Sequence, residues 1–188
     1  MTPILHLQSA RLVLRPWRDE DLPAFAELCA DPQVMRYFPE TLSRLQSAAV
    51  IGRIRGHFAE NGFGLWALER KDSGQFIGFT GLNRVDFESS FTPAVEMAWR
   101  LAREHWGLGY ASEAAWTVLR CGFGQLDLDE MVAFTATANL ASEKVMQAIG
   151  MRRERNDFDH PDLPEGHPLR RHLLYRITRA QWLDTLRG

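Results

Sequence analysis

The sequence predicts a mixed α+β domain with a mostly antiparallel central sheet. The predicted elements follow in the order strand, two helices, three strands, helix, strand, helix and two strands, with a final short helix. The length of 188 residues fits a single domain, residues 1–188, with a sizeable core. In the central stretch Ala94–Ala115, an alternating strand pattern passes through a glycine loop into a helical pattern.

The first strand and helix are defined by alternation and by a break. Ala10–Arg15 alternates and is predicted to be a strand that stops at Pro16. A helix is expected over Asp21–Cys29, with Asp19 as its cap. The Asp31-Pro32 pair then ends it, because the residue before a proline avoids helical dihedral angles.

A second helix and a hairpin follow. Apolar residues at helical spacing predict a helix over Thr41–Asn61 that ends at Gly62. Two strands are predicted at Gly64–Arg70 and Phe76–Asn83. The sequence Asp72-Ser73-Gly74 between them is typical of a hairpin turn.

In the central stretch, a strand leads into a loop that is suited to bind an anion. Alternation places Val95, Met97, Trp99 and Leu101 on one face and Glu96, Ala98 and Arg100 on the other. The glycines at 107 and 109 allow the backbone to approach a ligand closely. The N-terminus of a helix follows directly, and this position favours a phosphate. Two glycines before a helix are also compatible with a simple tight turn.

The C-terminal part completes the sheet. The predicted elements are a strand at Glu130–Thr137, a helix over Asn139–Ile149, strands at Met151–Asp157 and Arg170–Thr178, and a terminal helix over Arg179–Leu186.

Composition excludes several classes of function. The formal net charge of −2 provides no electrostatic footprint for nucleic acid or for a membrane surface. No apolar run reaches the roughly 18 residues of a membrane span. Cys29 and Cys121 lie in separate helical patterns and lack metal-ligand spacing, so we expect buried, reduced thiols in a cytoplasmic protein.

The glycine loop resembles the acyl-CoA-binding motif of the GNAT superfamily of N-acetyltransferases, most closely the RimJ/RimL-like branch that acetylates N-termini of ribosomal proteins. The family pattern is Gln/Arg-x-x-Gly-x-Gly/Ala. Gly109 and Ala111 match its last two positions, whereas Trp106 replaces Gln/Arg and leaves the pyrophosphate to backbone N–H groups. The resemblance implies acetyl-CoA as cosubstrate and a sheet of about seven strands, splayed between the fourth and fifth. The residues it implies for cofactor binding are Ala98, Trp99, Trp106, Gly107, Leu108, Gly109, Tyr110, Ala111, Ser112, Asn139 and Ser142.

Two residues are candidates for catalysis. Glu96, on the polar face of the central strand, is the expected general base, and the resemblance places a glutamate on this strand. Ser142 is expected to donate a hydrogen bond to the thioester sulfur, because Asn139-Leu-Ala-Ser142 resembles the family's Asn-x-x-Ser turn. The alternatives are a solvated carboxylate for Glu96 and an ordinary helix N-terminus for Asn139 and Ser142.

The segment Asp157–His172 holds three histidines and three prolines. The histidines lack the spacing of a metal site, so no metal is predicted. A rigid loop that borders the acceptor and a plain surface loop both remain open. Trp17, Phe38 and Trp66 could line the acceptor pocket, although scattered aromatic residues more often belong to the core.

The predicted function is acetyl transfer to a primary amine, on a protein N-terminus or a small molecule, by direct attack in a ternary complex. A non-catalytic acyl-CoA-binding sensor remains an alternative. A dinucleotide-binding oxidoreductase is a further alternative, because Gly107-x-Gly109 precedes a helix and Asp129 lies about 20 residues on. Both a monomer and a homodimer are compatible with the sequence.

Overall fold

A nine-stranded mixed sheet organises residues 4–187, the part of the chain that the computed structural model describes. The ends of the predicted 1–188 domain, residues 1–3 and 188, lie outside the described residues. The strand order is β1-β2-β3-β4-β5-β6-β9-β7, and β8 pairs with β9. The strands are β1 (Leu7–Gln8), β2 (Leu12–Arg15), β3 (Leu65–Arg70), β4 (Phe76–Arg84), β5 (Val95–Leu101), β6 (Glu130–Ala136), β7 (Arg152–Arg153), β8 (Phe158–Asp159) and β9 (Arg171–Thr178).

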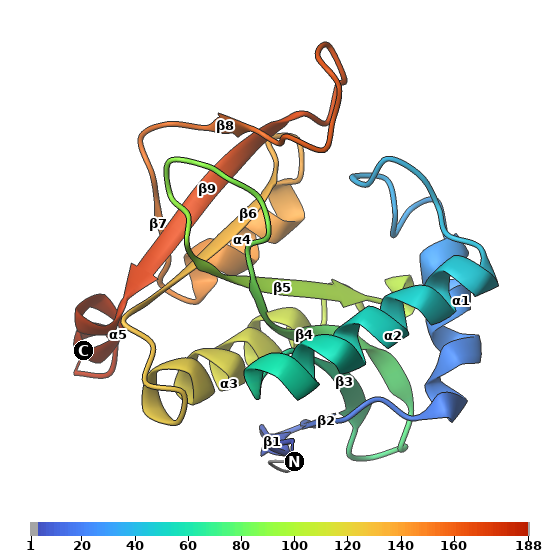
Figure 1. The fold of residues 1–188 in the computed structure, drawn as a ribbon. Coiled ribbons are helices and arrows are strands. Elements are labelled where there is room, and N and C mark those ends of the chain that lie inside the picture. The colour runs from blue at the N-terminus through green and yellow to red at the C-terminus, as the bar shows by residue number, and fades with distance from the viewer. Residues whose placement is uncertain (1–3, 188) are drawn as a thin grey trace.

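The sheet is antiparallel except between β5 and β6. These two parallel strands share the register pair Glu96↔Val132, whereas β6 and β9 are paired from Glu130 to Ala136. Figure 1 shows β5 and β6 running apart from this point. The predicted splay is therefore confirmed, although it lies between the fifth and sixth strands because the two-residue β1 was not predicted.

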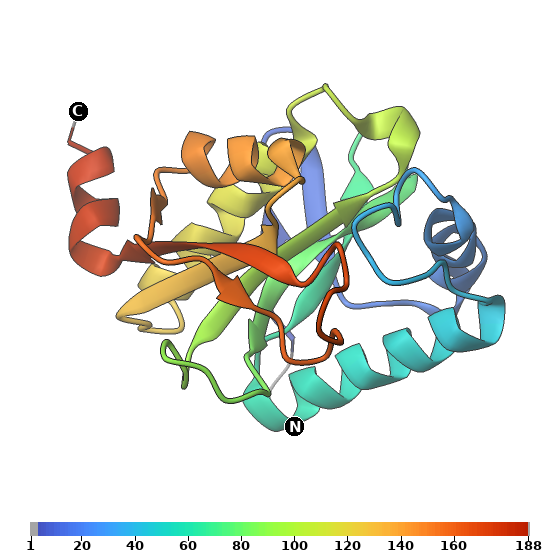
Figure 2. The ribbon, with the colours of Figure 1, turned by 90° about the horizontal axis from the view of Figure 1, so that it is seen from above.

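Helices cover both faces of the sheet (Figure 2). On one side lie α1 and α2, and on the other lie α3 and α4. The helices are α1 (Leu22–Ala30), α2 (Arg44–Asn61), α3 (Tyr110–Gly124), α4 (Leu140–Ala148) and α5 (Arg179–Thr185). Apolar residues of α2 and α3, such as Ile54 and Val118, pack into the same core as β3 and β5. Within residues 4–187, no helix is long and apolar enough to cross a membrane.

Local sequence signals explain the ends of α2. The Ser43 hydroxyl accepts from the Gln46 backbone N–H at 3.2 Å, and the Gln46 side chain accepts from the Ser43 N–H at 2.7 Å. Because of this capping box, α2 begins at Arg44, slightly later than the predicted start at Thr41. Gly62 ends it as predicted, in a left-handed conformation with φ 74°.

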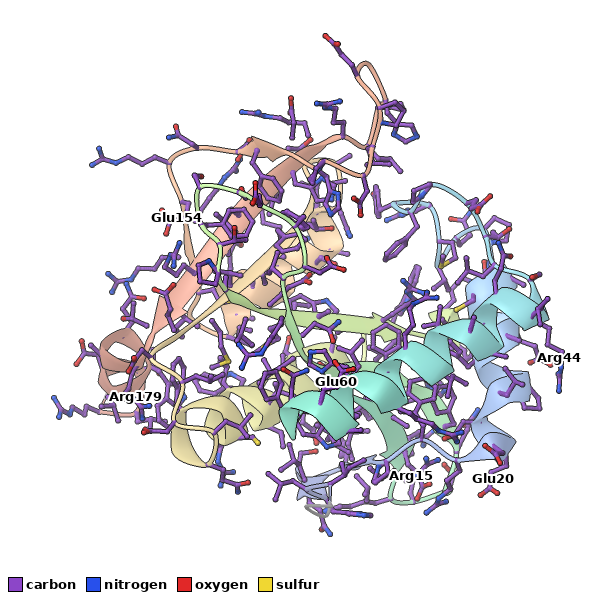
Figure 3. The ribbon with its side chains drawn as sticks, in the orientation of Figure 1. Arg15, Glu20, Arg44, Glu60, Glu154 and Arg179 are labelled. Atoms are coloured by element: carbon purple, nitrogen blue, oxygen red, sulfur yellow. The ribbon has the colours of Figure 1, made fainter. Side chains whose placement is uncertain are left out.

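The start of α1 depends on a buried charge cluster rather than on the predicted Asp19 cap. Asp19–Asp21 forms a 3₁₀ turn that leads into α1. The guanidinium of Arg15 binds both oxygens of Asp21, at 2.7 and 2.8 Å, and Glu69 at 2.6 Å. Figure 3 labels Arg15 where β2 ends. The cluster fixes the path from β2 into α1, because each buried charge has a close partner.

The predicted strand Met151–Asp157 is largely wrong. Only Arg152–Arg153 pairs with β9, and Phe158–Asp159 forms a separate short strand. The segment lacks alternating apolar residues, and Arg153 instead pairs with Asp157 at 3.0 Å. A strand without an apolar face has little to bury, so the chain leaves the sheet here.

Candidate active site

The glycine loop adopts the conformation that its sequence predicts. Gly107 and Gly109 have φ angles of 72° and 80°, which side chains with a Cβ rarely adopt. Gly109 is the N-cap of α3, and the Glu113 N–H donates to the Gly109 carbonyl as the first helical bond. The N–H groups of the preceding residues in this first turn lack intrahelical acceptors, so they can bind an anion.

Arg11 lies far from the glycine loop in the sequence but binds to it in the folded protein. Its Nη1 donates to the Leu108 carbonyl at 2.9 Å, and its Nε donates to Glu113 at 2.6 Å. The guanidinium also lies 4.3 Å from the centre of the Tyr110 ring. Burial of Glu113 opposes its ionisation, but hydrogen bonds from Ser9 and Arg11 outweigh this, so the pKa of Glu113 is lowered.

A cavity of about 360 Å³ opens beside the loop. Eight of the predicted cofactor residues line it, namely Trp99, Trp106, Gly107, Gly109, Tyr110, Ala111, Ser112 and Asn139. Leu108 and Ser142 are not among its lining residues, and Ala98 lines a neighbouring cavity instead. The first turn of α3 and the first turn of α4 thus face one space, although 30 residues separate them in the sequence.

Asn139 organises the turn that precedes α4. Its side-chain oxygen accepts from the Ser142 N–H at 3.2 Å, as an N-cap does. Its Nδ2 donates to the Ser142 hydroxyl at 3.1 Å and to the Thr135 hydroxyl at 2.9 Å. The Ser142 hydroxyl therefore accepts a bond from Asn139, which leaves its own proton available to another acceptor.

A second cavity of about 410 Å³ is also lined by Trp99. It shares Tyr37, Phe38, Trp99 and Arg100 with the first cavity, so the two adjoin. Its remaining lining residues are Pro39, Leu65, Phe79, Asn83, Glu96, Met97, Ala98, Phe134, Thr135, Met146, His160, Asp162, Leu163 and His172. We call the first space the loop cavity and the second the Glu96 cavity.

The carboxyl group of Glu96 is strongly perturbed. Burial in the protein, followed by the negative charge of Asp86, raises its pKa to about 8. A surface glutamate has a pKa near 4.3. The raised pKa of Glu96 therefore favours a general base for an amine over the alternative of a solvated surface carboxylate.

The histidine-rich segment folds over the Glu96 cavity. His160 and His172 line this cavity, with ring centroids 5.0 Å apart, and both rings pack against Phe134. Burial lowers the pKa of both histidines. Within residues 4–187, no group of three or more His, Cys, Asp or Glu side chains is placed to hold a metal ion.

The structure adds residues to the site that the sequence did not assign. These are Gln33, Val34, Arg36 and Tyr37, which border the loop cavity, and Tyr37 also reaches the Glu96 cavity. Phe38, which the sequence offered as a residue of the acceptor pocket, lines both cavities. The alternation of β5 placed Arg100 on the face of Glu96 but gave no role for it. Trp17 and Trp66 are core residues, 6% and 0% exposed.

The fold excludes the dinucleotide-binding alternative. That function requires an open, mostly parallel sheet. This sheet has one parallel pair, β5 with β6, among strands that are otherwise antiparallel. The pair Gly107-x-Gly109 is therefore not part of a dinucleotide-binding fingerprint.

Comparisons with known proteins agree with this architecture. The acetyltransferase (GNAT) domain family matches residues 11–152. The chain is 29% identical over 179 residues to the uncharacterized N-acetyltransferase YnaD of Bacillus subtilis, covering 95% of this chain and 99% of that protein. It is 31% identical over 188 residues to the FsC-acetyl coenzyme A-N(2)-transacetylase of Aspergillus fumigatus, covering 96% and 78%.

A solved structure extends the comparison of the fold. The spermidine N-acetyltransferase of Vibrio cholerae, determined in complex with CoA and spermine, superimposes with a TM-score of 0.73. It is 20% identical, and the match covers 92% of this chain and 98% of that one. On the match to residues 11–152 and on these relatives, the chain belongs to the acetyltransferase (GNAT) family and is an N-acetyltransferase that uses acetyl-CoA.

Proposed function

We propose that this enzyme transfers acetyl from acetyl-CoA to a primary amine by direct attack within a ternary complex. The observation that carries the proposal is the junction of the loop cavity and the Glu96 cavity at Trp99 and Arg100. The donor would enter from one side and the acceptor from the other, so that both are bound together. Bringing the two reactants together in this way supplies much of the catalytic effect.

The loop cavity would hold the donor. The pyrophosphate would lie at the N–H groups of about Leu108 to Ser112, and the pantetheine arm would run between Ala98-Trp99 on β5 and Asn139 before α4. The supporting observations are the open first turn of α3 and the cavity that Trp99 and Asn139 share. No side chain of the Gln/Arg type is required, because the backbone supplies the donors.

The Glu96 cavity would hold the acceptor. Glu96 takes a proton from the ammonium, directly or through a water, and the neutral nitrogen then attacks the thioester carbon. The new C–N bond forms as the C–S bond breaks, and the electron pair leaves with the CoA thiolate. The nitrogen then loses its second proton, to the thiolate or to water, and the amide is complete. A thiol has a pKa near 8.5, so the leaving group needs only a hydrogen bond. We assign that bond to Ser142, which lines neither cavity itself but is bound to Asn139, a residue that lines the loop cavity.

The experiment is a screen of amines with acetyl-CoA, including peptide N-termini, polyamines and amino acids, that records thiol release and product mass. Acetylation of at least one class is expected, with the new acetyl group on nitrogen. Binding of CoA without turnover on any amine would instead support the acyl-CoA sensor.

Four further properties remain predictions from the sequence. They are a cytoplasmic location, a monomeric or homodimeric state, membership of the RimJ/RimL-like branch, and one functional domain over residues 1–188.

A further inference from the structure

Arg100 is a partly buried cation with weak partners. It lies on β5 and lines both the loop cavity and the Glu96 cavity. Its Nη1 donates to the Cys29 sulfur at 3.5 Å, and sulfur is a weak acceptor. Its Nε is buried and has no hydrogen-bond partner among residues 4–187. A buried guanidinium in this state is costly unless something pairs with it.

Aromatic rings rather than carboxylates surround this guanidinium. Its central carbon lies 4.0 Å from the Phe38 ring centre and 5.3 Å from that of Phe79. These contacts stabilise a cation over the ring faces but leave its N–H groups free. Arg15 provides a contrast, because it is buried and is bound by two carboxylates. The enclosure of Arg100 therefore offers hydrogen-bond donors to a group that is not part of the protein.

Two carboxyl groups and a guanidinium line the Glu96 cavity. Glu96 and Asp162 line it, and so does Arg100. Glu96 and Arg100 lie four residues apart on the same face of β5, about 13 Å between Cα atoms, with Ala98 halfway between them. Two long side chains from these positions can converge on the space above Ala98. This arrangement matches a small molecule with an ammonium at one end and an anion at the other.

We propose that the acceptor is an amine that also carries a carboxylate, which pairs with Arg100 while its amine faces Glu96. This inference rests on the proposed function and narrows the substrate class to amino-acid-like amines. The guanidinium fork suits a carboxylate because it can donate two parallel hydrogen bonds. An uncharged amine of the same shape would leave Arg100 unpaired and should be a poorer acceptor.

The test compares acceptors with a carboxylate and the same acceptors with an amide in its place. Glycine, β-alanine, 4-aminobutyrate and a panel of L-amino acids are each assayed beside the corresponding amide, and kcat/KM is measured for both. The wild-type enzyme is expected to prefer the best acid over its amide by at least about tenfold. Equal or better turnover of the amides would overturn the inference and leave the proposed function intact. Acetylation of peptide N-termini or polyamines but of no acid or amide would overturn the inference alone, whereas no turnover on any amine would overturn the proposed function as well.

Substitutions of Arg100 test whether this residue causes the preference for acids over amides. In Arg100→Gln, the ratio of acid to amide should fall to about one, through a higher KM for the acid, while the Kd for CoA stays within about threefold. Arg100→Lys keeps the charge and should retain part of the preference. Arg120→Gln is the matched control, because Arg120 is exposed on α3 and should keep the full ratio.

Two results would show that Arg100 does not bind the carboxylate of the acceptor. An unchanged acid-to-amide ratio in Arg100→Gln would show that another group recognises the anion. A loss of CoA affinity of tenfold or more with that ratio unchanged would assign Arg100 to the cofactor. If Arg100→Gln does not fold, the comparison of acids and amides in the wild-type enzyme and in Arg100→Lys still decides the question.

Discussion

Arg11 donates from its Nε to the Glu113 carboxylate at 2.6 Å, and so joins the residue before β2 to the first turn of α3. The same carboxylate accepts from the Arg11 backbone N–H at 2.7 Å and from the Ser9 hydroxyl at 2.6 Å. Because Arg11 also binds the Leu108 carbonyl, the position of the glycine loop depends on the residue that directly precedes β2.

Arg11→Ala should therefore weaken CoA binding more than it weakens the fold. Its side chain is 46% exposed, and an exposed ion pair contributes at most about 1 kcal/mol to stability. Loss of the Leu108 contact should loosen the loop and raise the Kd for CoA by about tenfold, measured by calorimetric titration. Arg18→Ala is the control, because Arg18 is 51% exposed and lies at another site. Equal CoA affinity in both variants would contradict a role for Arg11 in the loop.

Gly109→Val tests the proposed phosphate site. A side chain at φ 80° is strained, and its Cβ would lie 3.4 Å from Arg11 Nη2. We expect this strain to displace the N–H groups that are proposed to bind the phosphate. We expect the Kd for CoA to rise at least about tenfold, and we compare this with Gly74→Val. Gly74 has φ 67°, and a Cβ added to it would meet no atom within 4 Å. The strain on the backbone is therefore similar in this variant, while the glycine loop at 107–109 is unchanged. If both folded variants bind CoA as the wild type does, the pyrophosphate lies elsewhere.

Glu96→Gln tests the proposed base. The wild-type kcat/KM should rise with pH as Glu96 ionises, through a pKa of about 8. The variant should lose roughly 10²-fold in kcat/KM at pH 8 and should retain only the titration of the acceptor amine. Asp86→Asn should shift the wild-type profile to lower pH, because the charge of Asp86 raises the pKa of Glu96. Glu88→Gln, an exposed control in the same loop as Asp86, should keep the wild-type profile. Profiles of equal height for Glu96→Gln and the wild type would rule out Glu96 as the base.

The same carboxyl group should make stability depend on pH. Between about pH 4.5 and 8, it is ionised in the unfolded chain but protonated in the folded protein. The folded state then binds more protons, so this contribution to stability is present at low pH and is lost as pH rises through that window. The upper limit is about 1.4 kcal/mol for each pH unit. The Tm of Glu96→Gln minus that of the wild type should grow from pH 5 to pH 8, and a constant difference would argue against the raised pKa.

Ser142→Ala should slow the chemical step by roughly tenfold to a hundredfold and leave CoA affinity nearly unchanged. The reason is the loss of one hydrogen bond to the departing sulfur, about 1–3 kcal/mol. The measurement is single-turnover acetyl transfer at saturating substrate, with Tm recorded in parallel. Ser73→Ala, in the exposed turn before β4, is the control. A lower Tm with an unchanged single-turnover rate would mean that Ser142 only supports the turn around Asn139.

The sequence alone determined the elements whose signals lie within a few residues. Gly62 ends α2 because a left-handed residue is needed there, and Gly107 and Gly109 form their loop for the same reason. The alternation in β5 correctly separated buried Val95 and Met97 from Glu96 and Arg100. Such rules act on neighbouring backbone and side-chain positions, so they can be applied without knowledge of the fold.

The tertiary structure decided what depends on distant contacts. Arg11 reaches the loop across a sequence separation of 97 residues, and Phe38 covers Arg100 from a different part of the chain. The pKa of Glu96 is set by the protein that surrounds it and by Asp86. Desolvation and pairing depend on which groups the completed fold brings together, and no local pattern encodes them. For this reason the sequence could name Glu96 as a candidate base, but only the folded chain showed its raised pKa. Only the folded chain, too, placed Arg100 in the same cavity, with an Nε that has no hydrogen-bond partner within residues 4–187.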